Sequence, residues 1–360
     1  VYAECGTLKG VCEVNVGEWI EFDGDIKAFK KLIEDKKSPL EYIKLTQDLV
    51  TEDAPNLFPI VIPKGKTVHL DVVENSIFYS YTNTGNYVSS VFLIDEGSFF
   101  IRSTGRDKRW GRIVLMNGND DGDILASKGN VIENRNGGLL HLEENSYLSL
   151  LGTYGTKSCY IVYNTDSTVL CENINIDDLL DAPGDNAGSF YNGKNSNMTI
   201  KGGLFRYGDS PCIINYGVID VIEDVYFTYS TNVIENYGTI GRISYCTFDT
   251  YAYNRKGIVC SGSNAIVYEI SDSSFLFNRD VFSDNPNDEP STAIEFTSGA
   301  TLGEIKNCET NAAIPIICDD TVKIIVGISS GKFSKPIDEK YLATGRTCVY
   351  NEEEQMYIVQ

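Results

Sequence analysis

Acidic and basic side chains that could cleave a sugar chain recur between residues 220 and 280. Hydrolysis of a glycosidic bond needs two carboxylates, one of them with a raised pKa, and a lyase site would combine Ca²⁺-binding acids with an Arg or Lys base. The candidates are Glu223, Asp224, Arg242, Asp249, Arg255 and Asp272. Because 51 of the 360 residues are acidic, carboxylate pairs also arise by chance, so the pattern leaves both a catalytic and a non-catalytic protein open.

A second group of oxygen-bearing side chains lies in the stretch NGNDDGD at 117–123. Asn117, Asn119, Asp121 and Asp123 occupy alternate positions, with Gly118 and Gly122 among them. Such spacing in a glycine-containing loop suits Ca²⁺, although the distal Glu of an EF-hand loop is missing. Asn and Asp are equally typical of polar turns. The stretch therefore predicts either a calcium site or a turn, and calcium is the one cofactor that the sequence suggests.

Tyrosines suggest a binding surface on the side of the molecule. The candidates are Tyr226, Tyr229, Tyr251 and Tyr253. Exposed tyrosines bind sugar rings or anchor a protein partner, because each combines a large apolar ring with a polar tip. Strand alternation would also place some of them inside. The ligand class left open is a polysaccharide or a host or cell-surface protein.

The ten cysteines include no C-x-x-C motif, and the chain has only two histidines, His69 and His141, so a zinc site is not expected. Five of the cysteines recur at apolar positions of a repeat, which predicts buried thiols that pack as small hydrophobic groups. These are Cys212, Cys246, Cys260, Cys308 and Cys318. Cys5 and Cys12 lie outside the repeat and form the predicted disulfide.

A repeat of short strands must position all of these residues. The phrase NVIEN occurs at 130–134 and again at 232–236, and an Ile followed five residues later by Phe recurs as Ile200/Phe205, Ile222/Phe227, Ile243/Phe248, Ile270/Phe275 and Ile328/Phe333, with Ile305/Thr310 between the last two. A second apolar patch recurs at 213–214, 233–234, 258–259, 294 and 316–317. Period-2 strands separated by Gly, Asn, Asp and Ser turns predict rungs of about 21 residues that bury their apolar faces only by stacking.

The ends of the chain differ from the repeat. Residues 1–57 are predicted to form an N-terminal cap with a first strand and an amphipathic helix over 25–38, in which Asp25 is the N-cap and Pro39 the stop. A helix over the open end of a solenoid would hide its exposed strand edge. The solenoid itself is predicted over 58–333, and residues 334–360 form a C-terminal terminator.

Composition excludes some partners. The formal net charge of −21 argues against binding to nucleic acid or to an anionic membrane surface, because both need a basic face. No apolar run approaches the roughly 18 residues of a membrane-spanning helix. The N-terminal letters VYAEC carry Val1 and Ala3 in an A-x-A-like arrangement, which suggests the remnant of a signal-peptide cleavage site.

The phrases YIKLTQDLV…IVIPKGKTVHLDV, YGTIGRISYCTF and GISSGKFSKPIDEKYLATGRTCVYNEEEQMYIV resemble those of right-handed parallel β-helix proteins of the pectin-lyase-like superfold. More narrowly, they resemble repeat-rich surface or secreted proteins of gut-associated Gram-positive bacteria. The resemblance implies an all-β, right-handed parallel β-helix with three sheets and an extracellular or cell-surface location. Rung length alone would also permit a left-handed or two-sheet solenoid.

We therefore expect a non-catalytic, adhesin-like β-helix protein that binds a glycan or a protein through a lateral, acidic, Tyr-rich face. The alternative is a polysaccharide lyase or glycoside hydrolase, which requires a groove with converging acids and a base. A filament or phage-type structural subunit is a weaker alternative. It requires an uncapped C-terminal rung, against which the tail GKFSKPIDEKYL argues.

Overall fold

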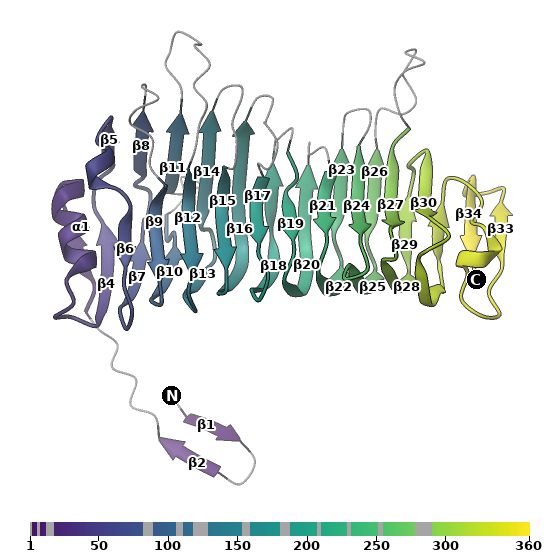
Figure 1. Ribbon diagram of the computed structural model, residues 1–360, viewed down its shortest axis with the longest axis horizontal. Helices are drawn as coiled ribbons and strands as arrows, with labels where there is room; N and C mark the ends of the chain where they lie inside the picture. Colours follow the sequence, from purple (N-terminus) through teal and green to yellow (C-terminus); the bar gives the residue numbers. More distant parts are fainter. Residues whose placement is uncertain are drawn as a thin grey trace.

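The chain forms a long stack of parallel strands. The computed structural model describes residues 2–5, 8–11, 18–81, 89–105, 111–117, 129–152, 159–180, 188–206, 210–228, 232–250, 255–277 and 290–360. Each strand of the stack pairs in parallel with its counterpart one coil further along (Figure 1). The fold is therefore a parallel β-helix. Within the described residues, no helix is both long and apolar enough to cross a membrane.

Each coil contributes strands to three faces. The first face holds β4 (Leu40–Leu45), β7 (Thr67–Asp71), β10 (Ser98–Arg102), β13 (Leu139–Leu142), the start of β16 (Thr168–Leu180), β18 (Asn197–Arg206) and β20 (Val218–Thr228), and then β22 (Thr239–Ser244), β25 (Ile266–Ser271), β28 (Thr301–Lys306) and β31 (Lys323–Ile328). The second face holds β5 (Leu49–Glu52), β8 (Ile77–Tyr81), β11 (Arg112–Asn117), β14 (Tyr147–Gly152), the ends of β16, β18 and β20, and then β23 (Thr247–Thr250), β26 (Ser274–Phe277), β29 (Cys308–Thr310) and β32 (Gly331–Phe333). The third face holds β6 (Ile60–Ile62), β9 (Ser90–Asp95), β12 (Asn130–Arg135), β15 (Tyr160–Thr165), β17 (Gly188–Asn192), β19 (Ile213–Asn215), β21 (Asn232–Asn236), β24 (Lys256–Ser261), β27 (Thr292–Thr297) and β30 (Ile314–Cys318).

The predicted apolar columns are confirmed as buried ladders. The isoleucines stack coil on coil from Ile200 to Ile328, and the phenylalanines stack from Phe205 to Phe333 with Thr310 in the predicted place. The rings of Phe248 and Phe275 are stacked with their centroids 4.5 Å apart. On the third face, Ile213 pairs with Ile234, which is 21 residues further on. Parallel strands lie about 4.8 Å apart, so these columns fill the interior continuously.

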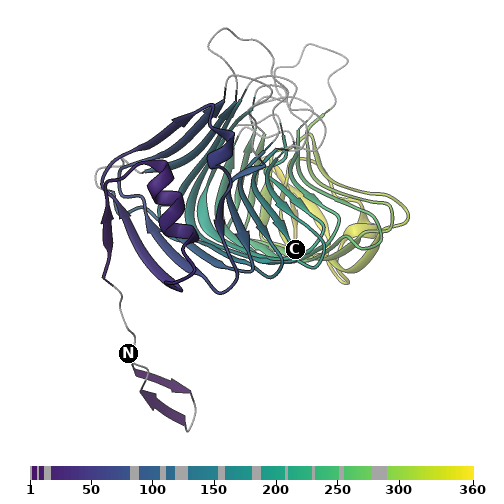
Figure 2. The same ribbon diagram turned by 60° about the vertical axis from the view of Figure 1, so that its left-hand side comes forward.

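The N-terminal cap contains helix α1 (Ile26–Glu34), whose buried residues Ile26, Phe29 and Ile33 face the coils. Asp25 is the predicted N-cap and accepts from the Ala28 N–H at 2.8 Å. The predicted end at residue 38 was wrong, because Asp35 is already extended and its Oδ1 accepts from the Lys37 N–H. That side-chain bond favours a turn over a further helical turn. Figure 2 shows α1 lying across the end of the stack.

Parallel pairing begins before residue 58, because β3 (Ile20–Phe22) pairs with β4 and β4 pairs with β7. The short helix η1 (Pro55–Leu57) precedes β6, and β1 (Tyr2–Cys5) and β2 (Leu8–Val11) pair with each other as an antiparallel hairpin. At the other end, β33 (Cys348–Asn351) and β34 (Met356–Val359) form an antiparallel hairpin, and β34 also pairs with β32. Helix η2 (Glu339–Tyr341) supplies the hydroxyl of Tyr341, which donates to the Cys318 carbonyl at 2.9 Å. These segments cover part of the last coil.

A ladder of buried asparagine amides follows the third face. The five residues are fully buried, and each of the first four donates from Nδ2 to the Oδ1 of the next at 2.8 to 3.0 Å, while the last donates to the Cys260 thiol. Each also donates to a main-chain carbonyl at the start of a first-face strand in the next coil. The members are Asn134, Asn164, Asn192, Asn215 and Asn236. The repeated phrase NVIEN is thereby explained, because its final asparagine is Asn134 in one copy and Asn236 in the other.

Replacement of Asn192 by Ala should destabilise the protein strongly. The substitution removes the acceptor of Asn164 and the donor to Asn215, and a buried polar group left unsatisfied costs about 1–3 kcal/mol. We expect the free energy of unfolding to fall by about 2–4 kcal/mol, measured from urea unfolding followed by circular dichroism. Asn197→Ala is the matched control, because Asn197 is exposed on β18 in the same coil. Equal losses in both variants would contradict the role of the ladder.

Candidate functional site

The six candidate residues at 220–280 lie at different places on the outer surface. Glu223 and Arg242 are on the first face and form an ion pair at 3.3 Å, with the Arg242 side chain 46% exposed. Asp224 and Asp272 have φ of 56° and 51°, so both occupy left-handed turn positions where the first face meets the second. The Asp272 carboxylate also accepts a hydrogen bond from the side-chain amide of Asn307 at 3.2 Å. These four residues therefore form a solvated charge pair and two corner turns.

Asp249 lies on the second face and is buried, and its carboxylate accepts a hydrogen bond from the hydroxyl of Tyr226. Tyr226 is itself 41% exposed. Arg255 is half-buried directly before β24 on the way to the third face. The structure thus brings Tyr226 to Asp249 and Glu223 to Arg242.

Several predicted residues lie outside the described part of the chain, and their roles stay predictions. These are Asn119, Asp121, Asp123, Tyr229, Tyr251, Tyr253 and Cys12; Asn117 and Cys5 are described only as the ends of strands β11 and β1. In the described ranges, no group of three or more His, Cys, Asp or Glu side chains is placed to hold a metal ion.

The five repeat cysteines are buried, as predicted. The eight cysteines from Cys159 to Cys348 whose side chains are described are free, and all except Cys348 are buried. Burial raises the pKa of Cys246, Cys260 and Cys308 to about 12 in each case. Because the thiolate is the nucleophilic form, these side chains are packing groups. His69 and His141 are half-buried residues of first-face strands.

A row of tyrosines lies on the outer side of the third face, and we call it the tyrosine row. Its members are Tyr163, Tyr191, Tyr216 and Tyr237, with Tyr160 buried beside the first two. The rings of Tyr163 and Tyr191 are stacked with centroids 4.8 Å apart, and those of Tyr216 and Tyr237 are stacked at the same distance. Tyr191 and Tyr216 join the two pairs at 5.7 Å and 42°. The row therefore runs along the stack across four coils.

The backbone positions of the row follow from the asparagine ladder. Tyr163 and Tyr191 come one residue before a ladder asparagine and pair with each other in register. Tyr216 and Tyr237 come one residue after such an asparagine, in the repeated tripeptide Asn-Tyr-Gly at 215–217 and 236–238. Sequence reasoning missed these four residues, and this tripeptide was the signal that could have found two of them. The ladder amide points inward, so its strand neighbours point outward.

Polar groups flank the tyrosine row. Glu235 accepts from the Tyr237 hydroxyl at 3.2 Å and from the Asn232 amide at 2.8 Å. At the other end, Glu133 pairs in register with Tyr163 and lies 3.3 Å from the Arg135 guanidinium. Tyr216 is 39% exposed, whereas the other three are half-buried. The row thus offers apolar ring edges, neutral hydroxyls and carboxylates on one continuous strip.

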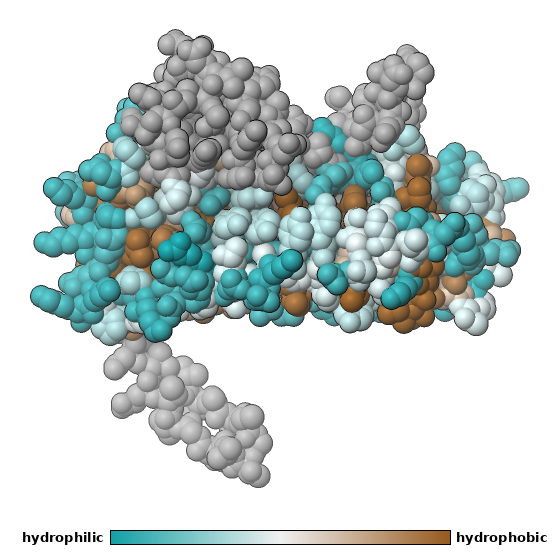
Figure 3. All heavy atoms as spheres, in the orientation of Figure 1, coloured by the Kyte–Doolittle hydropathy of each residue, from teal (hydrophilic) through white to brown (hydrophobic). Residues whose placement is uncertain are grey.

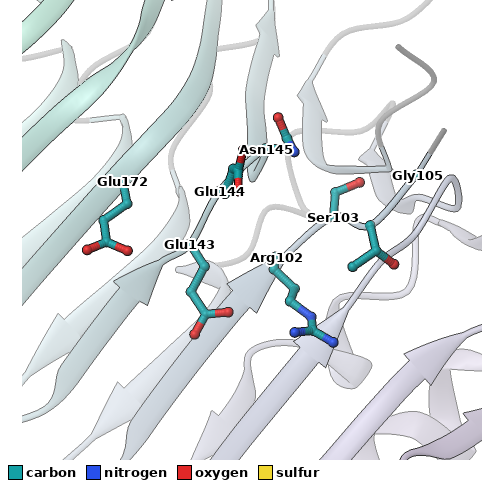
Figure 4. A pocket seen from close by; sticks show the side chains of 8 residues that line it. Arg102, Ser103, Gly105, Glu143, Glu144, Asn145 and Glu172 are labelled. Carbon is teal, nitrogen blue, oxygen red and sulfur yellow. The ribbon is translucent and has the colours of Figure 1, made fainter. Parts of the chain in front are cut away.

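A pocket of about 420 Å³ lies at the end of the first-face strands β10, β13 and β16, and its lining includes Arg102, Thr104, Glu143, Glu144 and Glu172. Arg102 is held in place: its Nε lies 3.2 Å from the Asp71 carboxylate, and its guanidinium lies 4.4 Å from the ring centroid of Trp19. Figure 4 shows Glu143 and Arg102 side by side, while Glu144 points away from both.

The two other acids of the pocket have different surroundings. Burial raises the pKa of Glu143, an effect that the nearby His141 and Arg102 oppose. Glu172 is more open, with its side chain 58% exposed, and lies 3.4 Å from His141 Nε2. Glu143 directly follows β13, which pairs with β16, the strand that carries Glu172. An acid with a raised pKa and a second carboxyl group one coil away are the groups that acid–base cleavage of a sugar chain uses.

Alkaline pH should destabilise the protein through the tyrosine row. Burial raises the pKa of Tyr163 and Tyr191, and it raises the pKa of Tyr237 to about 12. Because the folded state favours the neutral phenol, the tyrosines contribute stability to the folded state. This contribution is complete below the tyrosine pKa of about 10 in the unfolded chain, and it is lost as pH rises toward the folded-state pKa of Tyr237, about 12. The urea concentration at the midpoint of unfolding should fall between pH 9 and pH 12, and it should fall less steeply for the Tyr237→Phe variant. Identical slopes for both proteins would contradict the assignment.

In comparisons with known proteins, no protein-family model, no curated protein and no solved structure matches the chain.

Proposed function

We propose that this protein is a non-catalytic, extracellular or cell-surface β-helix that binds a linear glycan along its third face. The observation that carries the proposal is the tyrosine row, in which four rings from four coils lie in contact along the stack. Tyrosine suits such a surface because its ring is apolar and rigid and its hydroxyl both donates and accepts hydrogen bonds.

The direction of the row favours an extended polymer over a compact ligand. Four neighbouring coils at about 4.8 Å each present one strip of repeated chemistry, and a polymer of repeated units can contact successive rings in the same way. Burial raises the pKa of Tyr191 and Tyr237, so these two hydroxyls stay protonated well above neutral pH. Glu133 and Glu235 add acceptors for sugar hydroxyls at its margin. A protein that lays an extended segment on the same strip is the other partner consistent with this chemistry.

Substitution of Tyr216 tests the proposal. Tyr216→Ala removes the most exposed ring of the row and should weaken binding by about tenfold or more, which corresponds to at least about 1.4 kcal/mol. The measurement is affinity electrophoresis or calorimetry against a panel of linear plant and host glycans. Tyr268→Ala is the matched control, because Tyr268 is 53% exposed on β25 of the first face, away from the row. A panel that shows no binding, or equal losses in both variants, would reject the proposal.

The pocket at Arg102 supports a second candidate function, that of a glycoside hydrolase or polysaccharide lyase. Glycosidases place their two carboxyl groups about 5 to 9.5 Å apart, and side chains from neighbouring coils, about 4.8 Å apart at the backbone, can reach such separations. Glu143 would be the acid and Glu172 the base or nucleophile. Arg102, fixed by Asp71, would bind an anionic group of the substrate.

An assay for reducing ends and unsaturated products separates the two candidates. The binding proposal predicts no product from any polysaccharide of the panel, with or without calcium. The catalytic candidate predicts product whose rate falls about 100-fold or more in Glu143→Gln, the size of a general-acid contribution. Glu144→Gln is the matched control, because Glu144 lines the same pocket but points away from Glu143. Product release that survives Glu143→Gln would exclude this pocket as the catalytic site.

A further inference from the structure

A cluster of lysines covers the N-terminal end of this acidic protein. Residues 26–37 contain five lysines and two acids, a local charge of +3, although the whole chain has a formal charge of −21. In Figure 3, hydrophilic side chains cover the end at which α1 lies. We define the lysine cluster as Lys27, Lys31, Lys36 and Lys37, which are exposed.

The acids of this segment are already engaged. Glu34 accepts from Lys30 Nζ at 2.6 Å and from the Val61 N–H at 2.9 Å, so it joins α1 to β6. Asp35 Oδ1 accepts from the Lys37 N–H. None of the four lysines of the cluster lies within ion-pair distance of any carboxylate in the described ranges. The cluster therefore carries uncompensated positive charge.

The backbone beneath the cluster is held firmly. Lys66 is buried, and its Nζ donates to the carbonyls of Asp35 and Ser38 and to Glu41, which fixes the turn that carries Lys36 and Lys37. The helix itself is fixed by its buried side and by Lys30, which donates to the Pro59 carbonyl at 2.5 Å. Four cationic side chains thus project from a rigid support, which lowers the entropic cost of binding a ligand.

Helix stability accounts for only part of this arrangement, because Lys31 lies in the last turn of α1, where a cation is favourable. Lys27 lies in the first turn of α1, where a cation opposes the helix dipole, and this turn contains no acidic residue. Four lysines, the two acids Glu34 and Asp35, and Leu57 line a hollow of about 570 Å³; the lysines are Lys27, Lys30, Lys31 and Lys37. Lys30 is paired with Glu34, so the ammonium groups of the other three lysines leave the hollow with a net positive charge, which suits an anion.

We propose that the lysine cluster binds a linear carboxylated polysaccharide. A slender polymer can contact the cluster without approaching the acidic faces, because charges further away than about 8 Å are screened at physiological salt. A broad anionic surface, such as a membrane, would meet the remaining negative charge of the protein. The two acids within the segment favour a ligand with one charge per sugar unit over doubly charged phosphate groups. This site is separate from the tyrosine row and does not depend on its function.

The test uses the whole chain and polygalacturonate as the probe. Wild-type protein should bind polygalacturonate at low salt, bind more weakly as salt is raised, and not bind neutral dextran. Lys27→Glu with Lys31→Glu should weaken this binding by about tenfold or more. Both substitutions are on the exposed side of α1, away from its buried residues, so folding should be kept, as checked by circular dichroism.

The matched control is Lys194→Glu with Lys201→Glu, two exposed lysines of the middle coils. Both double variants change the formal charge by −4, from −21 to −25, so general repulsion of the polymer is equal. Binding by the control within about twofold of wild type is expected. Equal loss in the two double variants, no binding by wild type, or preferential binding to vesicles that contain phosphatidylserine would each overturn the proposal. Tyr216→Ala should leave polygalacturonate binding unchanged, which keeps this test distinct from that of the third face.

Discussion

The structure depends on the ladder of buried asparagine amides. Apolar contacts are non-directional, so the stacked Ile and Phe columns would tolerate small shifts of one coil against the next. An amide with no access to water must find its partners at hydrogen-bond distance, and here these partners are the amide and a main-chain carbonyl of the next coil. Between Asn134 and Asn236 the ladder therefore fixes both the spacing of the coils and the register in which they stack.

Register determines which side chains reach the surface. A slip of one residue would exchange the inner and outer positions of every strand, and Tyr191 would then replace Asn192 inside the stack. With the register fixed, residues far apart in the chain become neighbours on the outer faces. Tyr163 meets Tyr191 on the third face, and Glu143 comes within a coil of Glu172 on the first face. The positions of both candidate sites therefore follow from the register in which the coils stack.

The outer surface divides into regions of different chemistry. The third face has a row of tyrosines, the first face has a pocket with three glutamates and one arginine, and the N-terminal end has uncompensated lysines. The chemistry of each region therefore suits a different class of ligand. The net charge of −21 keeps anionic polymers away from the remaining surface.

The sequence alone determined the repeating architecture, the inward Ile and Phe columns, the place of Thr310 in the Phe column, the N-cap of the helix and the buried state of the repeat cysteines. These follow from periodicity and residue type, because a strand of period 2 with one apolar face must bury that face. The end of α1 was misjudged, because the Asp35 turn ends the helix before the predicted stop at Pro39.

Only the tertiary structure decided which outward residues meet. On the third face, coil lengths vary from 21 residues between Ile213 and Ile234 to 40 between Phe92 and Ile132, so the partner of a given residue in the next coil cannot be counted from a fixed period. The tyrosine row and the Glu143–Arg102 pocket were missed for this reason, while acids at 220–280 that are close in sequence lie on different faces. Outward side chains obey no packing pattern that a single sequence reveals, and their neighbours are set by the stacking of distant coils.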